Sequence, residues 1–135
     1  MAHASTTIMK KLNLGAGKDI KHSTPNETWT NLDELKLPGV DVVTNINSKL
    51  PFKNSEFDEI LCSHVLEHVD DLVKTMKELH RISKNGAKIH IRGPHFSCGV
   101  SYWDPTHKRT FSYFTFDFFT NKTFYATPRF KIRKR

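Results

Sequence analysis

Two glycines and an acidic residue have a spacing that suits a ribose-bearing ligand. Gly15 and Gly17 follow a short apolar run, and Asp33 comes sixteen residues after the second glycine. Glycine removes the side chain where a ligand approaches the backbone, and a carboxylate accepts two hydrogen bonds from a ribose diol. A tight turn and a surface acidic pair, Asp33 and Glu34, would explain the same residues. The pattern alone leaves both interpretations open.

A dinucleotide cofactor fits this pattern poorly. Its fingerprint has a third glycine three residues after the second, where this chain has Ile20. The fingerprint also opens a helix whose amino end binds pyrophosphate. Only eleven residues separate Gly17 from Trp29, and Pro25 interrupts them. The sequence therefore favours a ligand without phosphates over a nicotinamide cofactor.

A second group of reactive side chains lies in residues 95–112, where acidic, basic and aromatic residues are mixed. We interpret this segment as a substrate site: aromatic walls exclude water, one side chain takes a proton and an arginine orients an anionic group. A capped turn with a solvated basic end is the alternative. The candidates for proton transfer are His95, Asp104 and His107, and those for substrate binding are Tyr102, Trp103 and Arg109.

The eight histidines also raise the question of a metal site. His64 and His68 are four residues apart and would share a helix face, but Val65 stands where a metalloprotease motif has glutamate. Two cysteines, Cys62 and Cys98, do not make a zinc pattern or a disulfide framework. We therefore predict no metal ligands. Reduced thiols favour a cytoplasmic location.

Short strands and one helix must position these residues. Strands are predicted within 8–17, 28–35 and 38–46, around 57–62, and within 87–94. Apolar residues at helical spacing predict a helix over 64–83, with Asn85 and Gly86 as its stop. Strands joined by loops or helices imply a mostly parallel sheet, which binds ligands beyond the carboxyl ends of its strands. Five residues of interest fall at those ends: Gly15, Asp33, Asn45, Ser63 and Gly93.

With these segments in order, the chain resembles a small class I S-adenosylmethionine-dependent methyltransferase. The matching segments are "LNLGAGK", "TNLDE", "LPFKNSEFDEILCSHVLEHV" and "GAKIHIRGPHF", and they cover roughly residues 9 to 96. A "DPTHKR"-like segment after the fifth strand, found in a subgroup with a shortened first helix, matches residues 104–109. The resemblance implies a Rossmann-like fold and methyl transfer from S-adenosylmethionine.

The resemblance also implies roles for single residues. Asp33 would hold the ribose hydroxyls, and Asn45 stands where the family usually has an acidic residue near the adenine amino group. Many relatives carry cysteine at the position of Ala16. The residues expected around the cofactor are Gly15, Ala16, Gly17, Asp33, Asn45, Ile46, Ser63 and His64.

The fold class expected is α/β, in one domain over residues 1–135, with 1–8 as a leader and 96–130 as an aromatic-rich substrate or lid segment. Twelve of the fifteen aromatic residues lie between Phe96 and Phe130, too many for a plain solvent loop. Family members normally add a sixth strand and an antiparallel seventh. We therefore expect a truncated sheet whose open edge favours a homo-oligomer.

Charge and composition restrict the partners. The net charge is +7, and five positive charges lie in the last seven residues, so the basic character belongs mainly to the tail. Nucleic-acid binding through that tail is disfavoured, and no apolar run is long enough for a membrane span. Since "CSHV" and not an Asn-Pro-Pro-Tyr-like segment follows the fourth strand, we expect a small-molecule acceptor. The alternatives are a relative that binds the cofactor without transferring methyl groups, and a nucleic-acid-binding module.

Overall fold

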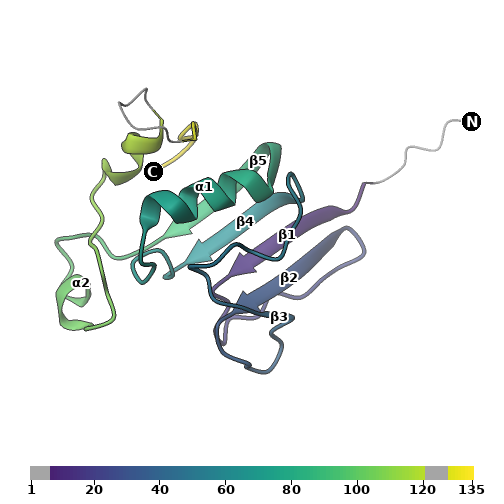
Figure 1. Ribbon diagram of the computed structural model, residues 1–135, viewed down its shortest axis with the longest axis horizontal. Coiled ribbons are helices and arrows are strands. Elements are labelled where there is room, and N and C mark those ends of the chain that lie inside the picture. The colour runs from purple at the N-terminus through teal and green to yellow at the C-terminus, as the bar shows by residue number, and fades with distance from the viewer. Residues whose placement is uncertain (1–6, 121–127) are drawn as a thin grey trace, which may run out of the picture.

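The computed structural model describes residues 7–120 and 128–135. The predicted leader lies almost wholly outside these residues, as does the 121–127 part of the aromatic segment. Five parallel strands form one sheet in the order β3-β2-β1-β4-β5 (Figure 1), which confirms the predicted α/β class. The elements are β1 (Met9–Leu14), β2 (Glu27–Asp33), β3 (Val42–Val43), β4 (Phe57–Ser63), α1 (Leu72–Ile82), β5 (Ser83–Arg92), α2 (Val100–Trp103) and the 3-10 helix η1 (Thr115–Phe119).

The register of the three central strands aligns their carboxyl ends. Leu14 in β1 pairs with Leu32 in β2 and with Cys62 in β4. The next residues along these strands, Gly15, Asp33 and Ser63, therefore stand side by side at one edge of the sheet. The prediction that they share this edge is confirmed.

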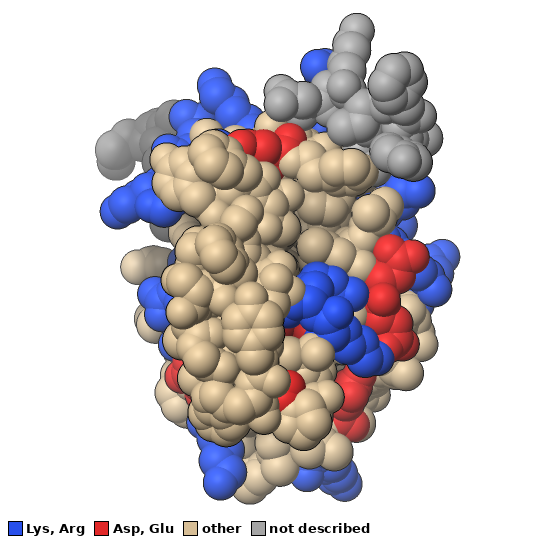
Figure 2. All heavy atoms as spheres, turned by 90° about the vertical axis from the view of Figure 1, so that its left-hand side faces the viewer, with Lys and Arg blue, Asp and Glu red and all other residues tan. Residues whose placement is uncertain are grey.

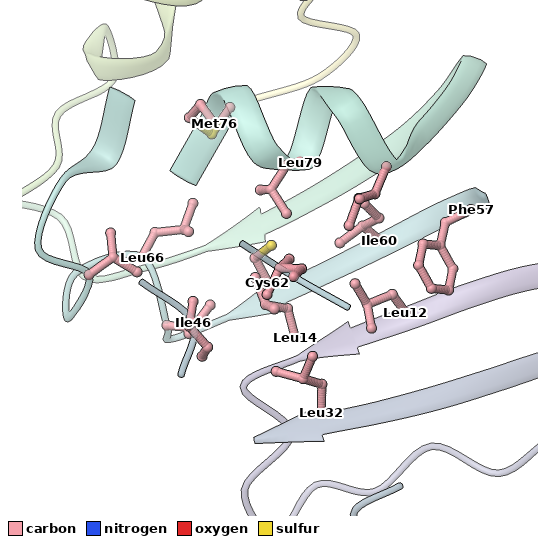
Figure 3. Packing of buried hydrophobic residues seen from close by; sticks show 14 of the residues in the cluster. Leu12, Leu14, Leu32, Ile46, Phe57, Ile60, Cys62, Leu66, Met76 and Leu79 are labelled. Carbon is pink, nitrogen blue, oxygen red and sulfur yellow. The ribbon is translucent and has the colours of Figure 1, made fainter. Parts of the chain in front are cut away.

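One face of the sheet is apolar and packs beneath α1 (Figures 1 and 3). Every second strand residue contributes to it, as Leu12 and Leu14 do in β1, because successive side chains of a strand point to opposite faces. Met76 and Leu79 of α1 are buried against this face. The fully buried side chains of the cluster include Leu12, Leu14, Leu32, Phe57, Ile60, Cys62, Leu66, Leu79 and Ile82.

The other face of the sheet is polar. Lys11 lies between Glu27 and Glu59, with Nζ 2.5 Å and 2.8 Å from their carboxylates, and the hydrogen bonds that its ammonium donates to Glu27 and Glu59 raise the pKa of Lys11. Asn13 and Asn31 are both buried, and the Asn13 amide donates to Asn31 Oδ1 over 3.0 Å. Parallel sheets are normally covered by helices on both faces, whereas here α1 covers only the apolar one.

Side chains of β1 and β2 hold the connection between these strands. Asn31 Oδ1 accepts from Lys21 N, and its Nδ2 donates to the Lys21 carbonyl, each over 2.9 Å. The Asn13 amide donates to the carbonyl of Asp19 over 2.8 Å. These bonds replace the helix that such a connection usually contains, and they set the path of the loop after Gly15.

The helix is shorter than predicted. It begins at Leu72, where the carboxylate of the N-cap Asp71 accepts from Lys74 N over 3.0 Å. Residues 64–70 form a turn instead of helix, although Val65, Leu66 and Val69 are buried. The expected helix stop is also wrong. Strand β5 already begins at Ser83, and Gly86, with φ +82°, lies within it at an irregularity of the β4–β5 pairing.

The aromatic segment divides into a packed part and an exposed part. Phe111 and Phe119 are buried in the core, and Phe116 and Phe130 pack against it, as predicted. The other large aromatic side chains that the structure describes in this segment are exposed: Phe96, Tyr102, Trp103, Tyr113, Phe114 and Phe118. No helix of the described residues is long and apolar enough to cross a membrane.

We predict that Asn31→Ala lowers the free energy of unfolding by about 2–4 kcal/mol, because it removes the bond from the buried Asn13 amide and both side-chain bonds to the Lys21 backbone. Urea denaturation measures this change. The matched control is Thr28→Ala, an exposed position in the same strand, which should change stability by less than about 0.5 kcal/mol. Equal effects of the two substitutions would contradict the role given to Asn31.

Candidate functional site

The glycine turn after β1 is held by backbone bonds to β2. Gly15 and Gly17 have φ of +70° and +53°, a left-handed conformation that favours glycine. Between them, Ala16 is buried and its N–H donates to the carbonyl of Leu32 over 2.9 Å. The turn therefore has one fixed position at the edge of the sheet.

The two glycines differ in their surroundings. A Cβ on Gly15 would lie 2.6 Å from Cγ2 of Val65, so the packed turn after β4 occupies that space. A Cβ on Gly17 would meet nothing within 4 Å. Packing thus explains glycine at position 15, while the open side of Gly17 is where a ligand can approach the backbone.

Asp33 joins the glycine turn directly. Its Oδ2 accepts from Gly17 N over 2.8 Å, and its Oδ1 accepts from Leu35 N over 2.9 Å. A carboxylate has about four acceptor positions, so each oxygen keeps one for a further donor. Asp33 is half-buried, and the structure brings it together with Gly17 as the sequence analysis expected.

Asn45 and Ile46 are engaged with their own neighbours. Asn45 Oδ1 accepts from Asn47 N over 2.9 Å. The backbone N–H of Ile46 donates to Oε1 of Glu34 over 3.4 Å. The side chain of Ile46 belongs to the core. Glu34, which the sequence analysis treated only as a surface neighbour of Asp33, thus links the ends of β2 and β3.

His64 and Ser63 complete this edge. His64 follows β4 with φ +55°, and its N–H donates to the carbonyl of Arg92 over 2.9 Å. Its side chain is exposed, whereas Ser63 is half-buried. The left-handed residue turns the chain sharply, so that Val65 can fill the space beside Gly15.

The segment after β5, which includes α2, lies at the same end of the sheet (Figure 1). Tyr102 and Trp103 in α2 are 68% and 72% exposed. His95 Nδ1 is 2.7 Å from the hydroxyl of Ser97, and the carbonyl of His95 accepts from the hydroxyl of Ser101 over 2.6 Å. His95 is itself exposed. These three predicted residues are therefore open to solvent.

Arg109 is committed to the turn 64–70. Its guanidinium donates to the carbonyl of Leu66 over 2.7 Å and to the carbonyl of Asp70 over 3.2 Å, and burial lowers the pKa of Arg109. The neighbouring Lys108 N donates to the Glu67 carbonyl over 2.8 Å. Arg109 was expected to bind substrate, but in the structure its side chain hydrogen-bonds the turn 64–70 and so holds residues 104–109 against that turn.

Asp104 and His107 face each other and lie beside His68. The backbone N–H of His107 donates to the Asp104 carbonyl over 3.2 Å, so residues 104–107 form a turn. Asp104 Oδ2 is 3.4 Å from His107 Nε2, and the His68 and His107 rings are 4.8 Å apart. Hydrogen bonds from the hydroxyl and N–H of Thr106 lower the pKa of Asp104. His68 lies far from this pair in the sequence, and no sequence pattern indicated that the three residues meet.

A parallel sheet of this order, with a glycine turn after the first strand and a carboxylate after the second, defines a Rossmann-like nucleoside-binding class. The family model described as a methyltransferase domain matches residues 8–91, more than half of the sequence. The chain belongs to the methyltransferase domain family.

Solved structures share the fold. An S-adenosylmethionine-dependent methyltransferase from Archaeoglobus fulgidus has a TM-score of 0.64 and 22% identity, covering 84% of this chain and 59% of its own. The YcgJ protein from Bacillus subtilis has a TM-score of 0.59 and 22% identity, covering 78% of this chain and 57% of its own.

Two curated relatives are uncharacterized proteins of Methanocaldococcus jannaschii. MJ0638 is 45% identical over 60 residues, which is 44% of this chain, and MJ1123 is 40% identical over 53 residues, which is 39% of this chain. The matched part is 26% of each relative, so the chain spans about a quarter of their length.

We predict that Gly15→Ala costs about 2–4 kcal/mol of stability, from left-handed strain and overlap with Val65. Gly17→Ala should cost only the strain, about 1–2 kcal/mol. Thermal and urea unfolding of both variants measure the difference. Adding Val65→Ala should recover at least about 1 kcal/mol of the Gly15→Ala cost, as contacting residues couple. Additive effects of the two substitutions would disprove the contact.

Proposed function

We propose that this chain binds S-adenosylmethionine at the carboxyl edge of its sheet and transfers the methyl group to a small-molecule acceptor. One observation carries the proposal: Asp33 accepts from Gly17 N over 2.8 Å and still has acceptor capacity on both oxygens. The family supports it, because methyltransferase domains are built around this cofactor.

The residues at this edge fit such a cofactor. A ribose diol offers two hydroxyl donors, which the two oxygens of Asp33 are able to accept. Gly17 leaves open space above its backbone, and this space suits a group that approaches the turn closely. Ser63, at the end of the neighbouring strand β4, and His64, which follows it, stand beside the turn. When bound, the cofactor supplies a methyl group already activated on a sulfonium.

The chain's own task is then to position the acceptor and to remove a proton where the acceptor carries one. We assign proton removal to His95. Its Nδ1 accepts a hydrogen bond from the backbone N–H of Ser97 over 3.3 Å and lies 2.7 Å from the Ser97 hydroxyl. The Ser97 hydroxyl can therefore pass its proton to the lone pair on Nδ1 while it takes one from the acceptor. The exposed rings of Tyr102 and Trp103 are suited to cover an acceptor. For Asp104 and His107, which lie beside His68, the geometry favours another role.

The surface favours a small molecule over a nucleic acid. The face beyond the strands' carboxyl ends is formed mostly by uncharged residues, and the basic cluster in the middle of this view borders a row of acidic side chains (Figure 2). In the tail, Arg135 forms an ion pair with Asp117 and stacks over the ring of Tyr113. Binding of a polyanion would compete with these contacts.

We predict that Asp33→Asn weakens S-adenosylmethionine binding. A charge-assisted hydrogen bond contributes about 1.5–3 kcal/mol, so the dissociation constant should rise by roughly 10- to 150-fold. Isothermal titration measures it, and circular dichroism checks that the fold is retained. Glu34→Gln is the matched control and should stay within about threefold of the parent. Equal affinities of the parent and Asp33→Asn would remove Asp33 from the site.

We predict that His95→Gln lowers methyl transfer by about 10²-fold, the lower range for loss of a general base, while S-adenosylmethionine affinity stays within about threefold. Release of S-adenosylhomocysteine, measured over a panel of small hydroxyl and carboxyl compounds, identifies the acceptor and then the rate. His90→Gln, an exposed histidine in β5, is the control. Cofactor binding without turnover on any acceptor would support the binding-only alternative instead.

A further inference from the structure

We infer that His68, Asp104 and His107 form a binding site for a divalent transition-metal cation, with the buried carboxylate of Glu67 behind it. One ligand atom from each of the first three residues lies within 4.8 Å of the others. The site joins the turn after β4 to the segment after β5. It does not depend on methyl transfer, and its test needs neither cofactor nor acceptor.

His68 has one ring nitrogen free for a cation. Its Nδ1 lies 3.1 Å from the carbonyl oxygen of Thr106 and 3.0 Å from the Thr106 hydroxyl. A carbonyl only accepts, so the Nδ1 atom carries the hydrogen and the lone pair of the neutral ring is on Nε2. A carbonyl that fixes the tautomer in this way is the usual outer partner of a metal-bound histidine.

Asp104 likewise has one oxygen engaged and one free. Its Oδ1 accepts from the N–H and the hydroxyl of Thr106, over 2.9 Å and 2.6 Å. Its Oδ2 is 3.4 Å from Nε2 of His107. Two ligands of a tetrahedral cation with bonds of about 2.1 Å are about 3.4 Å apart. Thr106 therefore orients both His68 and Asp104 toward the same point.

Buried atoms without partners give a second, independent indication. The Glu67 side chain is 1% exposed, and neither carboxylate oxygen has a hydrogen-bond donor among residues 7–120 and 128–135. The His107 side chain is also largely buried, at 6% exposed. A buried charge is very costly unless it is paired. Glu67 Oε1 lies 3.9 Å from Nε2 of His68, the nitrogen that we assign to the cation.

Charge and ligand type specify the ion. The carboxylates of Asp104 and Glu67 balance a charge of +2, and two imidazoles favour zinc and its first-row neighbours over magnesium or calcium. The largest ligand separation, 4.8 Å, exceeds the tetrahedral spacing, so His68 must move toward the other two. Binding would then bring the turn 64–70 closer to residues 104–109. Lys108 and Arg109 already connect these two segments through hydrogen bonds to the carbonyls of Glu67 and Leu66.

The first test uses the full chain, stripped with a chelator and titrated with Zn²⁺ by calorimetry and with Co²⁺ by visible absorption. We expect one equivalent to bind, with the ligand-field bands of a four-coordinate nitrogen and oxygen site. His68→Gln and His107→Ala should each weaken binding at least tenfold. His22→Ala, an exposed histidine in the β1–β2 loop, should bind as the parent does. If His107→Ala fails to fold, the more exposed His68 carries the test.

A second test separates a cation from an ordinary ion pair between Glu67 and a protonated histidine, since His64 Nδ1 is also 3.9 Å from Glu67. Glu67→Gln should leave the metal-free melting temperature unchanged or higher, but should reduce the rise that Zn²⁺ produces. A variant that is less stable with and without Zn²⁺ alike would overturn the role of Glu67. Absence of saturable Zn²⁺ and Co²⁺ binding, or equal affinity in His68→Gln and the parent, would overturn the site.

Discussion

The loop between β1 and β2 is held by side chains of the sheet and not by a helix, and the candidate cofactor edge depends on this. Asn31 bonds both backbone groups of Lys21, and Asp33 bonds the N–H of Gly17. Asn31 and Asp33 are two residues apart on β2, so their side chains point to the same face of the sheet. Strand β2 thereby fixes the start and the return of the loop, and the glycine turn cannot move without breaking these partly buried hydrogen bonds.

This arrangement explains why the strands alternate as they do. A parallel strand with helices on both faces is usually apolar throughout. In β1, Leu12 and Leu14 face the core while Lys11 and Asn13 face the side without a helix, and each of these polar groups has a partner. The polar face is therefore stabilised by pairing, and the apolar face by burial beneath α1 (Figure 3).

Much of this fold could be predicted from local sequence, because alternation and turn residues are local properties. The start of the helix could not. Val65, Leu66 and Val69 continue the spacing of the helix, but they are buried from a turn that begins at the left-handed His64. The grouping of His68 with Asp104 and His107 also had no signal, since thirty-five residues separate its two halves and the neighbouring positions of β4 and β5 bring them together. Glu67 offered one hint, as a charged residue inside the apolar run "VLEHV".

The turn 64–70 contacts both regions where we place chemistry. On one side, Val65 fills the space next to Gly15, where an added Cβ would lie only 2.6 Å from Cγ2 of Val65. On the other side, Glu67 and His68 face the cluster with Asp104 and His107, and the Leu66 carbonyl accepts from Arg109. Because a packed core transmits small displacements instead of absorbing them, a shift of His68 toward a cation would also act on Val65. The glycine turn and the histidine cluster are thus parts of one packed unit, joined through residues 65–68 of the chain.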